Sequence, residues 1–253
     1  MAKKEDTEIA VREDMEVAGI PDELAGIFSP KESMEGVEIR LPQIKILHQG
    51  KSFEMADGET VREFQGVILD VNNVNAYWKV SFQESGGGTP PQCMSTNGAR
   101  PDPMAEEMQS ELCKPCKQNQ FGSDGGRGKA CKNMKRIHVL LEGQHFPNRL
   151  TVPPTSMKFV DQYLSLLLNK GTPYELVVTK FSLKDASNKE GIKYSQLKLE
   201  NVGLATKDPA EAREIKKLKT EMLPMMRDTV MDDVQAVMTD HKNGNGYGDD
   251  SPF

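Results

Sequence analysis

The stretch that decides the fold is RLTVPPTSMKFVDQYLSLLLNKGTPYELVVTKFSL, residues 149–183. Its first four residues alternate as in a β-strand, and its last ten predict another strand. Between them lies an amphipathic helix, with Thr155 or Ser156 as N-cap and a stop signal at Gly171 and Pro173. We expect its apolar face to enter the core through Phe159, Val160, Tyr163, Leu164, Leu167 and Leu168.

The residues around this stretch predict further strands. Upstream, the alternating segments are 37–41, 44–47, 64–71, 76–82 and 136–141, and a turn is expected at Asn72 and Asn73. Downstream, residues 192–201 should pair with 174–183 in a hairpin with a polar tip. Strands, a helix and a closing hairpin follow the chain order of an OB-fold. We therefore predict a mainly β (α+β) protein with an OB-like Greek-key barrel, although other small barrels share this order.

The composition changes along the chain and predicts four segments and one insertion. The insertion is rich in Gly, Pro and Cys and has little periodicity, so it needs a staple to stay ordered. The predicted segments are an acidic mobile arm at 1–36, the OB-like core at 37–203 with its insertion at about 83–134, a helical segment at 204–239, and a flexible acidic tail at 240–253.

The helical segment carries clear signals for its start and its interruption. Asp208 is the expected N-cap, Pro209 takes the first helical position, and Glu211 can complete a capping box. Pro224 should break or kink the helix.

Charge is distributed unevenly over the 253 residues. The formal net charge of −6 would argue against nucleic acid if it were spread evenly. Residues 114–136, however, hold seven cations against Asp124 alone. No apolar run is long enough to span a bilayer, and the acidic N-terminus is unlike a secretory signal. We therefore expect a cytoplasmic protein without a membrane partner, in which thiols stay reduced.

All four cysteines fall within the insertion, at Cys93, Cys113, Cys116 and Cys131. Cys113 and Cys116 form a CxxC knuckle that lets two sulfurs reach one ion, and the outer cysteines can complete a tetrahedral Zn²⁺ site. One structural zinc would order the insertion without an apolar core. An iron–sulfur cluster and a thioredoxin-like redox pair are the alternatives, the latter without the βαβ context it needs.

Basic and aromatic residues that could hold a single strand occur in the insertion, at the end of the strand before it, and interleaved along the closing hairpin. Rings stack on bases, and cations follow the phosphate backbone. The ordinary alternatives are a solvated metal knuckle and β-core packing. We expect one of the adjacent Tyr77 and Trp78 to be buried and the other exposed. The candidate nucleic-acid contacts are Tyr77, Trp78, Lys114, Lys117, Phe121, Arg127, Lys129, Lys132, Lys135, Arg136, Lys180, Lys193, Tyr194 and Lys198.

Motifs for common enzyme classes are missing from the sequence. It contains no GxxxxGK[ST], GxSxG or HExxH pattern, and no GxGxxG follows a strand. The four histidines have no evident carboxylate partners. We therefore expect a protein that is not an enzyme.

Two parts of the chain resemble known proteins. Residues 91–93, 113–116, 128–133 and 150–156 resemble a group of bacteriophage proteins found among replication and recombination genes. Asp249, Asp250, Pro252 and Phe253 resemble the acidic tip of bacterial and phage single-stranded DNA-binding proteins, with Ser251 where an apolar residue is usual. This resemblance implies that the tip recruits replication or recombination partners, whose basic pocket takes the acids and the phenyl ring.

The sequence as a whole predicts a single-stranded DNA-binding protein of DNA replication and recombination. The runner-up is a zinc-ribbon adaptor or regulator of a replication or transcription enzyme. A metal-dependent nuclease built from dispersed acids is the third hypothesis.

Overall fold

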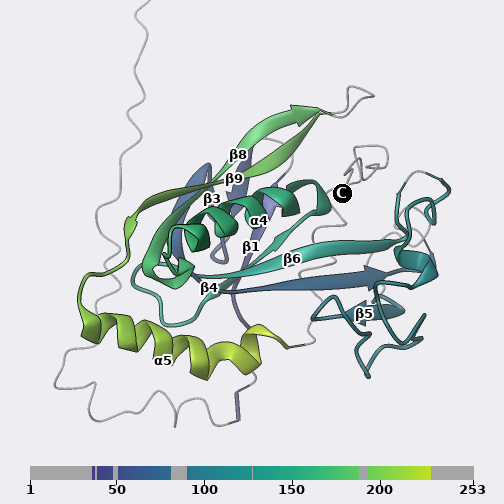
Figure 1. Ribbon diagram of the computed structural model, residues 1–253, viewed down its shortest axis with the longest axis horizontal. Coiled ribbons are helices and arrows are strands. Elements are labelled where there is room, and N and C mark those ends of the chain that lie inside the picture. Colours follow the sequence, from purple (N-terminus) through teal and green to yellow (C-terminus); the bar gives the residue numbers. More distant parts are fainter. Residues whose placement is uncertain are drawn as a thin grey trace, which may run out of the picture. The chain divides into compact units, whose positions relative to one another are not determined.

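The computed structural model describes residues 36–37, 39–47, 51–80, 90–126, 128–187 and 193–228. The chain divides into two units, residues 1–40 and 41–253, and every element below belongs to the second unit. The described residues of that unit are mainly β and form a curled half-barrel sheet with two α-helices (Figure 1). The predicted α+β class is therefore confirmed.

The described elements follow the predicted sequence of strands, helix, hairpin and helix. In chain order they are β1 (Gln43–Leu47), β2 (Ser52–Glu54), β3 (Thr60–Val61), β4 (Glu63–Tyr77), β5 (Cys93–Ser95), the 3₁₀ turn η1 (Lys117–Asn119), β6 (Cys131–Leu140), β7 (Asn148–Val152), α4 (Pro154–Asn169), the 3₁₀ turn η2 (Tyr174–Leu176), β8 (Val177–Ser187), β9 (Lys193–Leu204) and α5 (Pro209–Met226).

The long strand β4 organises the sheet, whose strand order is β3-β2-β1-β7-β6-β4-β8-β9. It pairs antiparallel with β6 along most of its length, with β8 at its start and with β5 at its end. The turn predicted at Asn72 and Asn73 is wrong, because β4 continues through both residues. The side chain of Asn72 instead donates to the carbonyl of Thr96, 2.8 Å away, and so ties the loop after β5 to the sheet.

Other predicted boundaries also shift. Described residues between 36 and 42 form no strand, the strand expected at 76–82 ends at Tyr77, and β6 begins five residues earlier than expected, at Cys131. Pairing explains the last two differences, because Tyr77 and Cys131 face each other at the end of the β4–β6 ladder.

Helix α4 covers the apolar face of the sheet. Val160, Tyr163 and Leu167 are buried against strand residues such as Ile137 and Phe181. The Tyr163 hydroxyl lies 2.7 Å from the Thr179 hydroxyl, so its polar end is satisfied inside this core. Leu168, predicted to face the core, is 57% exposed because the helical turn places it on the opposite side.

The N-cap expected at Thr155 or Ser156 is also wrong. The N-cap lies two or three residues earlier, at Pro153, which makes no side-chain hydrogen bond, and helix α4 begins at Pro154. The buried Ser156 hydroxyl instead accepts a hydrogen bond from the amide of Leu197 at 3.0 Å. A residue suited to capping therefore joins the helix to the edge strand β9.

Helix α5 lies on the other side of β4 and β6 from α4 (Figure 1). Its start is as predicted, with Pro209 in the first turn and the Asp208 carboxylate accepting from the amide of Ala210 at 2.9 Å. Pro224 does not end the helix, which continues to Met226. Met226 is buried with Leu41 and Leu69, and this contact anchors the end of the helix. Neither α4 nor α5, the α-helices of the described residues, is long and apolar enough to cross a membrane.

Candidate metal centre and nucleic-acid interface

The segment from residue 90 to Cys131, which we call the cysteine module, lies at the far end of the β4–β6 ladder. It contains β5 and η1 and otherwise consists of turns. Hydrogen bonds between side chains and the backbone hold these turns, where a sheet would use backbone hydrogen bonds between strands. The Ser123 hydroxyl, for example, donates to the Gln120 carbonyl at 2.7 Å and accepts from the Ala130 amide at 2.9 Å. Such local bonds hold a chain that has little apolar core.

The CxxC knuckle has the turn geometry expected from its sequence. The amide of Cys116 donates to the carbonyl of Cys113 at 3.3 Å, and the amide of Asn119 donates to the carbonyl of Cys116 at 3.0 Å. The Asn119 side chain also donates to the Cys113 carbonyl at 2.8 Å. These bonds fold the backbone around the two sulfurs and fix the start of η1.

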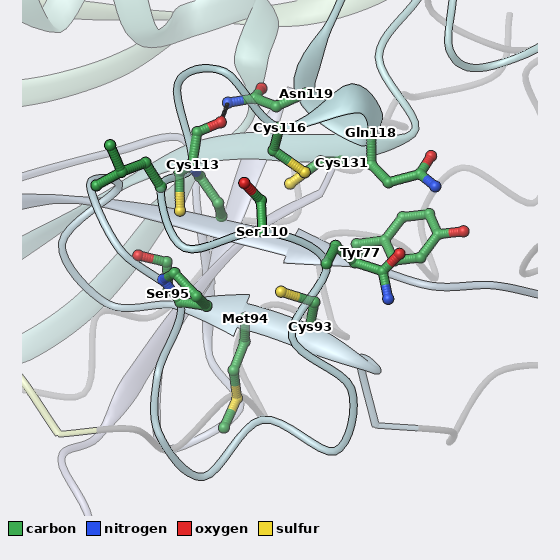
Figure 2. Close-up of a pocket in the computed structure, with 14 residues that line it drawn as sticks. Tyr77, Cys93, Met94, Ser95, Ser110, Cys113, Cys116, Gln118, Asn119 and Cys131 are labelled. Carbon is green, nitrogen blue, oxygen red and sulfur yellow. Dashed lines mark hydrogen bonds between the residues drawn. The ribbon is translucent and has the colours of Figure 1, made fainter.

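All four cysteines line one small pocket, together with Tyr77, Met94 and Ser110 (Figure 2). None forms a disulfide, and all except Cys93 are buried. Four free thiols in one pocket have the chemistry of a zinc donor set. Within the described residues, however, no three Cys, His, Asp or Glu side chains are placed as they stand to hold an ion. Holding one would require the sulfurs to draw together.

Burial and nearby thiols raise the pKa of two cysteines of this pocket, Cys93 and Cys131. Burial raises the pKa of Cys131 to about 12, and the neighbouring Cys113, Cys116 and Cys93 add to the rise. The pKa of Cys93 is also raised, chiefly by burial, with smaller contributions from Cys113 and Cys116. The thiols are therefore close enough to sense one another's charge.

The surface of the module displays part of the predicted nucleic-acid set. Lys114 and Lys117 are exposed, and the ring of Phe121 is 62% exposed. Lys129 is half-buried, while Lys132 donates to the Asp124 carboxylate at 2.8 Å. Arg127 lies outside the described residues.

Tyr77 and Trp78 do not divide into one buried and one exposed residue, as expected. Both are half-buried. Tyr77 ends β4 and lines the cysteine pocket, whereas Trp78 packs against Val74, Ala76 and Met134. Because β4 ends at Tyr77, the strand alternation behind the prediction does not reach Trp78.

The two predicted cations within β6 are buried. Lys135 is 8% exposed and bonds to Asn73 at 2.7 Å and Asp161 at 3.0 Å. Arg136 is 0% exposed and donates to the carbonyl of Asp228 at 3.1 Å. Neither side chain faces solvent in this conformation, so the two differ from the lysines of the module.

The cations of the β8–β9 hairpin stand apart from the module. Lys180 pairs with Glu63 at 2.7 Å, and Lys198 pairs with Glu200 at 2.8 Å. Lys180 lies opposite Gln65, near the start of β4. The module lies beyond Tyr77 at the other end of this strand, and Gln65 and Tyr77 are roughly 40 Å apart along an extended strand. Tyr194 is half-buried, and the side chain of Lys193 lies outside the described part.

A polar cluster under α5 was missed by sequence reasoning. Asp70 receives two hydrogen bonds from Arg227, at 2.9 and 3.2 Å, and lies 3.9 Å from Nδ1 of His138. His138 therefore has the carboxylate neighbour that the sequence did not reveal. The available signal was a polar residue next to apolar ones within each strand, at His138 between Ile137 and Val139 and at Arg149 before Leu150.

Comparisons with protein-family models, curated protein sequences and solved structures found no match. The residues predicted to bind a partner, Asp249, Asp250, Pro252 and Phe253, lie outside the described residues, as do most of the N-terminal arm and the end of the segment predicted at 204–239.

Proposed function

We propose that this protein binds single-stranded DNA without cleaving it and serves replication or recombination. One observation carries the proposal: the exposed ring of Phe121 lies in a module whose neighbouring Lys114 and Lys117 are also exposed. An exposed phenyl ring in the same short segment as exposed lysines offers a base a stacking surface and offers phosphates a positive field. The unpaired bases of a single strand can reach such a ring, whereas the bases of a duplex cannot.

The strand pairings support an OB-like core for this function. Strands β4, β6 and β7 form an antiparallel meander, α4 follows, and β8 returns to pair with the free side of β4 before β9. This is the chain order of an OB-fold. One departure is that the second described neighbour of β7 is β1, in parallel, and not β9.

We propose one structural zinc held by Cys93, Cys113, Cys116 and Cys131. The four free thiols around one pocket fit this ion, since thiolates are its preferred ligands. When bound, zinc supplies folding energy to the turns of the module. Its role is to hold Lys114, Lys117 and Phe121 in place.

The test is a fluorescence-anisotropy titration with dT oligomers at two salt concentrations. Phe121→Ala should weaken binding about 5- to 150-fold, because stacking contributes roughly 1–3 kcal/mol per base. Leu166→Ala is the matched control, since Leu166 is 61% exposed on α4. Its affinity for DNA should not change.

The salt dependence tests the lysines separately. Lys114→Ala with Lys117→Ala should reduce the slope of log affinity against log salt by about 1.4, roughly 0.7 per phosphate contact. Lys170→Ala with Lys207→Ala removes two exposed charges elsewhere and should leave the slope unchanged.

The alternatives give different results in the same experiment. A zinc-ribbon adaptor would show weak binding that none of these variants changes. A nuclease would shorten the oligomer when Mg²⁺ or Mn²⁺ is added. Partner recruitment by residues 249–253 remains part of the proposal as a prediction from the sequence.

A further inference from the structure

The face of the sheet under α5 carries basic side chains from two neighbouring strands. Arg136 and His138 of β6 alternate with the core residues Ile137 and Val139, so they point away from α4. In the register of the sheet His138 faces Arg149 of β7. Arg136 is 0% exposed and Arg149 is 3% exposed. Two guanidinium groups are thus buried on this face of the sheet.

The last turn of α5 and the residues directly after it meet both guanidinium groups. Arg136 donates to the Asp228 carbonyl at 3.1 Å, and Arg149 donates to the Met225 carbonyl at 3.4 Å. Carbonyl oxygens at the C-terminal end of a helix carry partial negative charge. A phosphate carries a full charge and can accept two parallel hydrogen bonds from one guanidinium group, whereas each arginine here donates a hydrogen bond to a neutral carbonyl of this turn. A phosphate could therefore replace these carbonyls with a gain in energy.

The same turn is held to the sheet by an ion pair and is preceded by a proline. Arg227 locks it by two hydrogen bonds to the buried Asp70 carboxylate. Pro224 precedes it and lacks the amide that would continue the helical ladder, which favours bending at this position. Displacing residues 225–228 also withdraws Met226, which is 0% exposed, from its contacts with Leu41 and Leu69. The turn therefore opens only when bound DNA offsets this loss, while the earlier turns of α5 remain packed.

The covered face extends along β6 toward the cysteine module, with the buried Met134 between Lys132 and Arg136. Lys132 lies four residues before Arg136 on β6, so both side chains project from the same face. The distance between them along the strand is about 13 Å. Asp70 lies on β4, and a strand of DNA running from the module over β6 and β7 keeps its phosphates on the basic side.

We propose that the face carrying Arg136 and Arg149 is a phosphate-binding surface for single-stranded DNA, closed in the free protein by residues 225–228 of the α5 end. This inference rests on the proposed function. It adds a second DNA-binding surface and the turn that covers this surface in the free protein. DNA that enters from the module displaces the turn and takes over its hydrogen bonds to the two arginines.

The first test is Arg227→Gln, which removes the charge that holds the turn to Asp70. The affinity for a dT oligomer long enough to extend beyond the module should rise about tenfold, because the open state no longer has to be selected from a small population. Arg213→Gln is the matched control, since Arg213 is exposed on the first half of α5. Adding Arg149→Gln to Arg227→Gln should cancel the gain.

The second test needs no substitution. Hydrogen exchange of the wild-type protein should show faster exchange at the amides of Arg227 and Asp228 when dT is bound, and slower exchange along β6. Unchanged affinity in Arg227→Gln together with slower exchange at residues 225–228 would overturn the inference while leaving the proposed function intact. Absence of dT binding by every chain, wild type included, would overturn both.

Discussion

At the scale of single residues, Gly66 shows how closely two strands approach in this sheet. A Cβ atom at this position would lie 2.5 Å from Cγ1 of Val139 and 2.7 Å from the carbonyl oxygen of Leu140. The second neighbour is backbone and cannot rotate away. The start of β4 therefore requires a residue without a side chain where it crosses the end of β6.

Gly66→Ala should lower the free energy of unfolding by about 1–3 kcal/mol, the usual cost of overpacking a core. Urea denaturation followed by circular dichroism measures the change. Gln65→Ala, at the exposed neighbouring position of the same strand, should stay within about 0.5 kcal/mol of wild type. Equal stability of Gly66→Ala and wild type would mean that β4 and β6 separate easily at this point.

The surroundings of individual residues were the hardest feature to predict from the sequence. The alternation of β6 correctly places Ile137 and Val139 in one layer, yet it could not show that Arg136 is buried. A charged residue on a strand is ordinarily assigned to solvent. Its burial depends on the end of α5, 92 residues further along the chain, which local pattern does not report.

At the scale of elements, the helices show which signals can be read from sequence. The cap at Asp208 was predicted correctly because Asp, Pro and Glu act within one turn. Glu211 accepts its described hydrogen bond from the Thr206 hydroxyl, however, and that hydroxyl accepts from the Asp208 amide. The start of α4 was misplaced because Ser156 serves the distant strand β9. The sequence shows which side chains are able to cap a helix. It does not show whether such a side chain bonds to its own helix or to a distant strand.

Asp208→Ala should destabilise α5 by about 1 kcal/mol, because the Ala210 amide loses its acceptor. The effect should appear as faster hydrogen exchange in the first two turns of α5 and a lower urea midpoint. Lys217→Ala, an exposed change in the same helix, should have no such effect. If Asp208→Ala leaves exchange unchanged, the apolar packing of α5 against the cluster of Leu41, Leu69 and Met226 holds the helix without its cap.

At the scale of the whole molecule, the second unit has separate apolar clusters with different supports. The main cluster lies between the sheet and α4 and includes Ile68, Val160 and Phe181. A small cluster of Val74, Ala76 and Met134 lies at the base of the cysteine module, with Trp78 packed against it. The sequence predicted the division between barrel and insertion from composition. It could not predict that β6 begins inside the insertion, at Cys131, and pairs there with the end of β4.

This division leads to a prediction about metal removal. Purified protein should contain about one zinc per chain. A strong chelator should shift the emission of Trp78, the single tryptophan of the chain, to longer wavelength, because the module above its packing site loses its staple. The far-ultraviolet dichroism of the sheet should change little, since the main cluster lies between the sheet and α4 and contains no cysteine. Added zinc should restore the emission, and Cys116→Ser should weaken this recovery. Two results would contradict this prediction: a folded chain that contains no metal, or a Trp78 emission that is insensitive to chelation. Either result would show that the four thiols pack without an ion. The basic surface of the module would then have to be held by its side-chain hydrogen bonds alone.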